Sequence, residues 1–181
     1  MAGRKSLTIP QRIGDAAEIN YGGPSGPDFA ALARDRTPVR TMTDRDLAAL
    51  IAIDRRITGG DRSAYFEQKL AEALHESDVR VSLVAEREGR PIGFIMARVD
   101  FGEFGRLEPT AVMDTIGVDP DYRGQGVGRA LLSQLLINLA TLRVERIRTE
   151  IDWRERELFT FLDICGFRPS QRLCFEHVLE A

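Results

Sequence analysis

A glycine-rich loop between an apolar run and a leucine-rich helix is the feature that most constrains this chain. The apolar run covers residues 111–118 and is closed by the turn Asp119-Pro120-Asp121-Tyr122. The loop reads Arg123-Gly124-Gln125-Gly126-Val127-Gly128 and leads into a helical pattern over 129–139. The first turn of a helix has backbone N–H groups without partners, and glycines let a ligand approach them closely. We therefore expect an anion site, most often a phosphate site, at this helix start.

The spacing of the glycines separates three kinds of phosphate loop. A P-loop needs a lysine and a hydroxyl after its last glycine, but Arg129-Ala130 follows Gly128 here. A dinucleotide fold needs G-x-G-x-x-G after the first strand, whereas this loop reads G-x-G-x-G and follows a later strand. The third pattern, [QR]-x-x-G-x-[GA], is matched by Arg123, Gly126 and Gly128.

With its lead-in from Ile116 to Tyr122, the loop resembles motif A of the GNAT N-acetyltransferase superfamily. The resemblance implies acetyl-coenzyme A as co-substrate, with its pyrophosphate held by the loop. Arg123 either binds phosphate or clamps the turn. Ile116 and Val118 are expected to present N–H groups to the acetyl and pantetheine amides. The pyrophosphate is expected on the backbone amides of Gly124, Gln125, Gly126, Val127, Gly128 and Arg129.

The periodicity predicts one α/β (α+β) domain over residues 37–181. The element order β-α-α-β-β-β-α-β-α-β is that of the GNAT fold, with a mixed, mostly antiparallel twisted sheet flanked by helices. Residues 1–36 lack a sustained period and are expected to form a flexible or loosely docked leader. Strands are predicted at 146–152, which alternates cleanly, and at 172–179. The family usually ends in two strands, so the last one is expected to be an edge, or to be completed by the leader or by a second subunit in a homodimer.

The residue that accepts the proton of the amine is sought among carboxylates. Asp114 lies two residues before Ile116, and Glu150 lies on the polar face of the 146–152 strand. Family members that acetylate protein N-termini often keep a base at the position of Glu150. Glu108 and Asp152 are further candidates. The alternative is that Arg148 forms a solvated ion-pair face with Glu150 or Asp152, which would contribute under about 1 kcal/mol.

The resemblance implies an N-acetyltransferase that transfers an acetyl group to a primary amine by direct attack in a ternary complex. The acceptor, a small molecule or a peptide, is expected at the link 57–65, which is glycine-bearing and polar. One alternative is an enzyme of the same fold that acetylates protein N-termini or lysines. Another is a non-catalytic acyl-coenzyme A sensor, because Leu162 stands where the family often has a tyrosine that protonates the leaving thiolate.

Composition narrows the remaining classes. The net charge is −3 and no basic stripe is present, so no nucleic-acid partner is expected. No apolar run reaches about 18 residues, so no membrane span is expected, and the start has no secretory pattern. Cys165 and Cys174 are expected to be reduced in a cytoplasmic protein. His75 and His177 are isolated, so no metal site is expected.

Overall fold

The structure of the chain is a computed structural model, which describes residues 36–75, 79–100, 109–171 and 175–178. Almost all of the expected leader, residues 1–35, lies outside these ranges.

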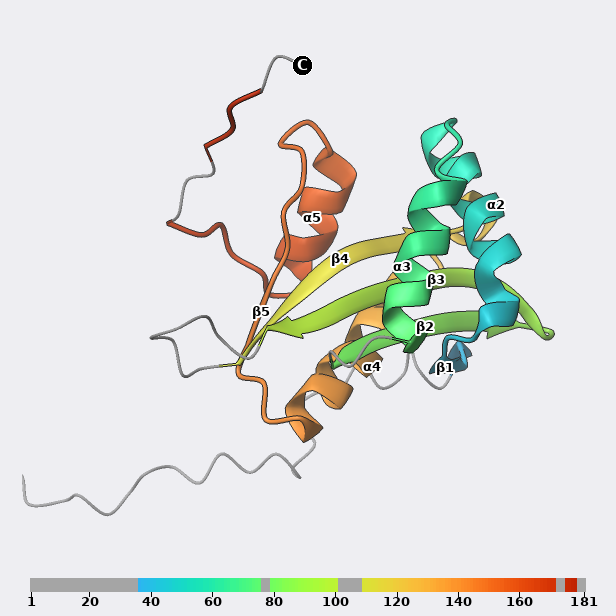
Figure 1. Cartoon of the computed structure of the whole chain (residues 1–181), viewed down its shortest axis with the longest axis horizontal. Helices are drawn as coiled ribbons and strands as arrows, with labels where there is room; N and C mark the ends of the chain where they lie inside the picture. The colour runs from blue at the N-terminus through green and yellow to red at the C-terminus, as the bar shows by residue number, and fades with distance from the viewer. Residues whose placement is uncertain (1–35, 76–78, 101–108, 172–174, 179–181) are drawn as a thin grey trace, which may run out of the picture.

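Within the described ranges, one five-stranded sheet forms the centre of the structure, in the order β1-β2-β3-β4-β5 (Figure 1). The first three pairings are antiparallel, and β4 with β5 is parallel. Together with the helices on its faces, this confirms the predicted fold class. The strands are β1 (Val39–Thr41), β2 (Arg80–Arg87), β3 (Arg90–Asp100), β4 (Thr110–Val118) and β5 (Arg146–Arg148). The helices are η1 (Asp44–Asp46), α2 (Leu47–Thr58), α3 (Ser63–His75), η2 (Pro120–Tyr122), α4 (Val127–Thr141) and α5 (Arg156–Ile164).

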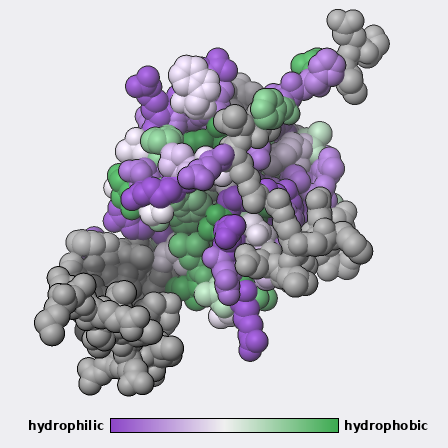
Figure 2. All heavy atoms as spheres, turned by 90° about the vertical axis from the view of Figure 1, so that its left-hand side faces the viewer, coloured by the Kyte–Doolittle hydropathy of each residue, from purple (hydrophilic) through white to green (hydrophobic). Residues whose placement is uncertain are grey.

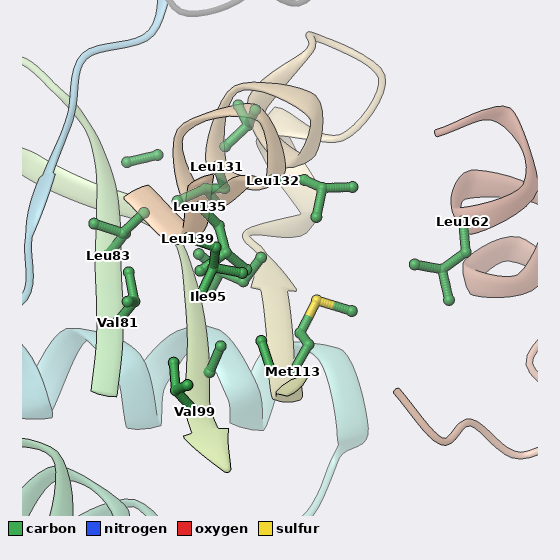
Figure 3. Close-up of a cluster of buried hydrophobic side chains, with 14 of the residues drawn as sticks. Val81, Leu83, Ile95, Val99, Met113, Leu131, Leu132, Leu135, Leu139 and Leu162 are labelled. Carbon is green, nitrogen blue, oxygen red and sulfur yellow. The ribbon is translucent and has the colours of Figure 1, made fainter. Parts of the chain in front are cut away.

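Helix α4 covers one face of the sheet with a stripe of leucines. Leu131, Leu135 and Leu139 recur every four residues and are at most 2% exposed, which explains why the segment is helical and where it packs. They meet side chains of β2, β3 and β4, among them Val81, Ile95 and Met113 (Figure 3). Full burial of a leucine contributes about 1.5–3 kcal/mol, so this stripe fixes α4 under the sheet.

Helices α2 and α3 cover the opposite face with a second cluster of apolar side chains. Leu50 and Ile53 of α2 and Phe66 of α3 pack against Val84, Phe94 and Met96 of the sheet. Phe66 and Phe94 meet edge to face, with ring centroids 5.4 Å apart. The sheet is therefore buried on both faces where α2, α3 and α4 pack on it. Helix α2 lies over the carboxyl end of β4.

The predicted strand at 146–152 is too long, because β5 ends at Arg148. The alternation of Ile147, Thr149 and Ile151 is present in the sequence, but a strand also needs a neighbour to pair with. After Arg148 the Thr149 hydroxyl, and not its backbone, donates to the Met113 carbonyl at 2.9 Å. Backbone pairing with β4 stops there.

The predicted last strand at 172–179 is also wrong in its described part. Residues 175–178 form no strand, and Phe175 and Val178 are 88% and 85% exposed. The remaining positions of that prediction, 172–174 and 179, lie outside the described residues. A segment such as 175–178 forms a strand only if a sheet edge lies beside it, and the ladders of the described sheet end at β5.

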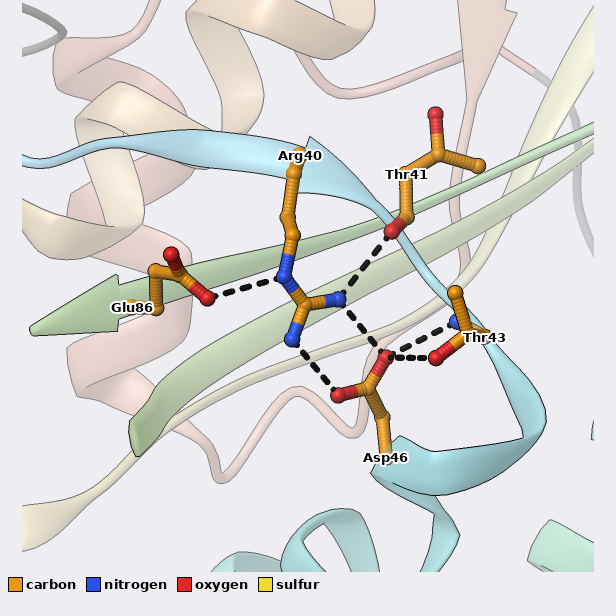
Figure 4. A network of polar contacts seen from close by, with 5 residues as sticks. All are labelled: Arg40, Thr41, Thr43, Asp46 and Glu86. Atoms are coloured by element: carbon orange, nitrogen blue, oxygen red, sulfur yellow. Dashed lines mark hydrogen bonds and ion pairs between the residues drawn. The ribbon is translucent and has the colours of Figure 1, made fainter. Parts of the chain in front are cut away.

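A buried carboxylate joins β1, β2 and the start of the helical layer (Figure 4). Asp46 is 3% exposed and accepts both Arg40 guanidinium donors at 2.8 Å. It also accepts the Thr43 backbone N–H at 2.8 Å, as expected for a capping residue. Arg40 in turn donates to Glu86 of β2 at 2.8 Å. The Arg40 hydrogen bonds hold the pKa of Asp46 below its usual value, against the opposing effect of burial.

We predict that Asp46→Asn destabilises the protein at neutral pH by about 1–3 kcal/mol, because the charged partner of Arg40 is lost. A carboxyl with a lowered pKa in the folded state stabilises above its ordinary pKa of about 4, and this contribution disappears as the pH falls through the lowered value. Urea unfolding at pH 7 and in acid should show the difference between variant and parent shrinking in acid. The exposed Asp44→Asn is the matched control. An equal loss at both pH values would contradict the ionic role.

Candidate functional site

The carboxyl-terminal half of β4 has a neighbour on one side only among the described strands. Within the described part of the chain, β5 pairs with β4 over Thr110–Val112 alone, and the Thr149 hydroxyl makes the next hydrogen bond to β4, at Met113. On the other side, Met96 of β3 lies opposite Thr115 and Ala97 lies opposite Met113, so Asp114 is an extra residue in β4. Such a bulge bends a strand and redirects its side chains. Strands β4 and β5 thus separate at Met113, directly before the bulge residue Asp114.

The N–H groups of Ile116 and Val118 point into this separation. Asp119 donates its N–H to the Ile92 carbonyl at 2.9 Å. Because hydrogen-bonded and non-hydrogen-bonded pairs alternate along an antiparallel ladder, Ile116 and Val118 are in non-hydrogen-bonded pairs with β3. Their N–H groups therefore face the side on which β5 no longer pairs, where they can donate to a ligand.

The glycine loop follows directly and leads into α4. Gly124 and Gly126 have φ values of +72° and +86°, a region that favours glycine. A side chain on Gly124 would meet nothing within 4 Å, so the space over the loop is open. Gly126 precedes the first residue of α4 and offers no side chain to cap it, which leaves the amides of the first turn for an external acceptor. Gly128 lies between β4 and α5, since a Cβ there would be 3.4 Å from the Phe161 ring.

The side chains next to the separation of β4 and β5 are apolar. Ile116, Val118, Leu158 and Phe161 are half-buried against the core under α4. Seen from the side of α5 and β5, hydrophobic side chains lie in the middle of this face, with hydrophilic ones mainly above them (Figure 2). A groove with apolar walls and an amide-lined end suits a long ligand with an anionic head.

Two arginines fix the loop from outside the motif. Arg56 of α2 binds the turn before the loop, with contacts of 2.5 Å to Asp119 and 3.0 Å to Asp121. Arg87 of β2 lies 5.1 Å from the Tyr122 ring centroid and donates to the Gln125 side chain at 2.9 Å. Neither arginine belongs to a sequence motif, and only the fold brings them to the loop.

The side chains of the loop residues take mainly structural roles. The Gln125 amide nitrogen donates to the Asp121 carbonyl at 3.0 Å, so this side chain closes the turn. Tyr122 packs against the core and under Arg87. Arg123 is half-exposed and lies 3.5 Å from the exposed Glu157 of α5. That contact is long, which leaves both expected roles of Arg123 open. Arg129 is exposed on the first turn of α4.

The two carboxylates predicted from the sequence lie on the same cleft. It has a volume of about 180 Å³ and opens where β4 and β5 separate. Asp114 is 12% exposed there and is bound by the Arg98 guanidinium. Glu150 is exposed and makes no hydrogen bond or ion pair with the residues that the structure describes. The lining residues are Arg98, Val112, Met113, Asp114, Arg148, Thr149 and Glu150.

The other carboxylates are placed differently. Asp152 is bound by Arg154 at 3.0 Å, which lowers its pKa, and it does not line the cleft. Glu108 lies outside the described residues. Arg148 pairs with Asp100 at 3.5 Å, so the ion-pair face expected with Glu150 or Asp152 does not form.

The link between α2 and α3 is held by its own contacts. Asp61 accepts the Ser63 N–H at 3.0 Å and pairs with Arg55 at 2.8 Å, which identifies it as the cap of α3. The Arg62 guanidinium lies 5.5 Å from the Tyr65 ring centroid. Burial raises the pKa of Tyr65, and the Asp114 carboxylate is among the charges that act in the same direction. Tyr65 packs against the apolar cluster between the sheet and helices α2 and α3.

At the position where a tyrosine was sought, Leu162 packs from α5 into the core and is 5% exposed. Its side chain supplies no hydroxyl to the site. Within the described ranges, no group of three potential metal ligands occurs. Across the same part of the chain, none of the helices combines the length and the apolar character that a membrane crossing needs.

Comparisons with known proteins agree with this arrangement. The family model described as acetyltransferase (GNAT) family matches residues 47–167. The chain is 28% identical over 134 residues to a mycothiol acetyltransferase of Propionibacterium freudenreichii subsp. shermanii, covering 68% of this chain and 40% of that protein. It is 30% identical over 114 residues to an uncharacterized N-acetyltransferase of Methanocaldococcus jannaschii, covering 60% and 50%. The chain thus spans half or less of the length of these curated relatives.

Solved structures show the same fold at low identity. A transcriptional regulator from Bacillus halodurans C-125 has a TM-score of 0.69 at 15% identity, covering 78% of this chain and 99% of that one. The aminoglycoside acetyltransferase AAC(6')-Iy, in complex with the bisubstrate analogue CoA-S-monomethyl-acetylneamine, has a TM-score of 0.67 at 18% identity, covering 79% and 98%.

If the loop binds a phosphorylated ligand, Arg56 should matter although it is outside the motif. We predict that Arg56→Ala lowers the affinity for coenzyme A about two- to tenfold, because the turn at Asp119 loses its anchor. Titration calorimetry measures the effect. Arg55→Ala removes a comparable exposed pair from the same helix and should change little. The effect of Arg56→Ala should largely vanish in an Asp119→Asn background; full additivity would contradict the anchoring role.

Proposed function

The chain belongs to the acetyltransferase (GNAT) family, and on that premise we propose that it is an acetyl-coenzyme A-dependent N-acetyltransferase. Its acceptor is a primary amine that attacks directly in a ternary complex. One observation carries the proposal: where β4 leaves β5, two strand N–H groups without a described strand partner precede the glycine loop and the α4 start, which has no side-chain cap, and a cleft with two carboxylates opens beside them.

The residues of the groove fit acetyl-coenzyme A. The amides from Gly124 to Arg129 stand at the positive end of the α4 dipole, which suits a pyrophosphate. The N–H groups of Ile116 and Val118 suit the amides of a pantetheine chain, and one of them can bind the carbonyl oxygen as charge develops on it. When bound, the co-substrate supplies the thioester, and these backbone groups orient it.

Glu150 is the proposed proton acceptor. It lines the cleft and has no competing cation among the described residues, so its lone pairs are available to an ammonium group. Asp114 lines the same cleft, but Arg98 already occupies its carboxylate. Asp114 therefore suits a role in orienting Arg98 and the acceptor better than the role of base.

A small acceptor fits this cleft better than a folded protein surface, because its volume is only about 180 Å³. The names of the relatives point the same way, since they include a mycothiol and an aminoglycoside acetyltransferase. A protein N-terminal or lysine acetyltransferase of the same fold is the enzymatic alternative. Leu162 favours one further candidate, a non-catalytic acyl-coenzyme A-binding domain.

The loop assignment predicts that Gly126→Asp abolishes measurable coenzyme A binding while the fold is retained. The substitution puts a negative charge where phosphate is expected, and Gly126→Ala separates this effect from backbone strain at φ +86°. The control is Gly59→Asp, at φ +73° with nothing within 4 Å of the added atom. Calorimetry and circular dichroism give the two readouts. Unchanged affinity in Gly126→Asp would exclude the site.

The base assignment predicts that Glu150→Gln lowers kcat about 10²- to 10⁴-fold and leaves the affinity for coenzyme A unchanged, because the amine no longer has a proton acceptor. The acidic limb of the pH–rate profile should change as well. Asp114→Asn is the comparison, with a smaller effect on kcat. If Asp114→Asn is nearly inactive and Glu150→Gln loses less than about tenfold, Asp114 is the base.

A further inference from the structure

The cleft is lined by more charged side chains than a proton acceptor alone requires. Its lining holds two guanidiniums, Arg98 and Arg148, beside the carboxylates Asp114 and Glu150, over the apolar side chains of Val112 and Met113. A site built only to attract cationic amines would not place two arginines in its wall, because each repels a further ammonium group.

The two arginines differ in how far their charge is satisfied. Arg98 binds Asp114 directly and lies 3.4 Å from Asp100. Arg148 lies 3.5 Å from the other oxygen of Asp100 and makes no hydrogen bond within the described part of the chain. A contact of 3.5 Å is long for a hydrogen bond, and the Arg148 side chain is 49% exposed. Its planar fork of donors is therefore available to a ligand.

Glu150 lines the same cleft as Arg148 and carries the opposite charge. The two residues are two positions apart in the chain, and both line the cleft. Both side chains are long and line the same cleft, so their heads can contact neighbouring groups of one small molecule. Glu150 suits an amine, and the Arg148 guanidinium suits a carboxylate, which it binds through two parallel hydrogen bonds.

We propose that the acceptor is an amino acid, or a small molecule with the same pairing of a free amine and a carboxylate, and that Arg148 binds its carboxylate. This inference rests on the proposed N-acetyltransferase function. It separates the chain from acetyltransferases of polycationic acceptors, since a second ammonium group near the amine would face Arg148. Arg148 is then a specificity-determining residue, and Glu150 is next to the nitrogen that receives the acetyl group.

The test compares free amino acids with their amides, in which the carboxylate is replaced and the amine is kept. Release of coenzyme A thiol is measured at saturating acetyl-coenzyme A, with spermidine and an aminoglycoside in the same panel. We expect at least one amino acid to exceed its amide by about 10- to 100-fold in kcat/KM, mainly through KM. In Arg148→Gln the acid should fall to the level of the amide. Arg146→Gln changes the neighbouring exposed arginine of β5, which does not line the cleft, and should keep the preference.

Binding separates failure of this inference from failure of the proposed function. Calorimetry with coenzyme A present measures the affinity of each acid and amide for the parent and for Arg148→Gln. Acetylation of amides or polyamines without preference for acids, or a preference that survives Arg148→Gln, would overturn the carboxylate site and leave the N-acetyltransferase in place. Binding of acids through Arg148 without turnover would support the site and refute the enzymatic function.

Discussion

The end of the pairing between β4 and β5 governs the rest of this structure. Three residues of each strand pair, and then the Thr149 side chain replaces the backbone ladder. Beyond that point β4 has N–H groups without a strand partner among the described residues, and a polar backbone group of this kind needs another acceptor. The bulge at Asp114 comes directly after the last contact with β5 and puts a carboxylate where the strands separate. The same interruption therefore creates the groove, its hydrogen-bond donors and the cleft.

Helix α2 connects the two halves of the proposed site. Its Arg56 binds the turn before the glycine loop, and its carboxyl end leads into the link before α3, near which Arg62 and Tyr65 lie. Because direct attack needs the amine and the thioester at a fixed distance, the elements that hold them must not move independently. Arg56 contacts the carboxylates of both Asp119 and Asp121, and Leu50 and Ile53 of the same helix pack on the sheet. These contacts hold α2 rigidly to the glycine loop and to the sheet.

The sequence was sufficient for features that depend on local chemistry. The glycine loop and the leucine stripe of α4 lie where they were predicted, because positive φ and helical periodicity are local requirements. The strand at 146–152 was predicted too long, because alternation does not reveal where a neighbour leaves. The contacts of Arg56 with Asp119 and of Arg148 with Asp100 could not be predicted from the sequence. Each joins segments that are far apart in the chain, and only the topology brings them together.

Leu162 indicates which proton transfer the site must support. It packs from α5 towards the core under β4, at some distance from the leucines of α4 (Figure 3), and a phenol in its place would need a hydrogen-bond partner. A thiol has an ordinary pKa of about 8.5, so a thiolate leaves without prior protonation at modest cost near neutral pH. An alkylammonium has an ordinary pKa near 10.4 and must lose a proton before it can attack. In the proposed reaction the more demanding step is thus at the amine. Glu150, which has no ion-pair partner among the described residues, lines the cleft proposed for that amine.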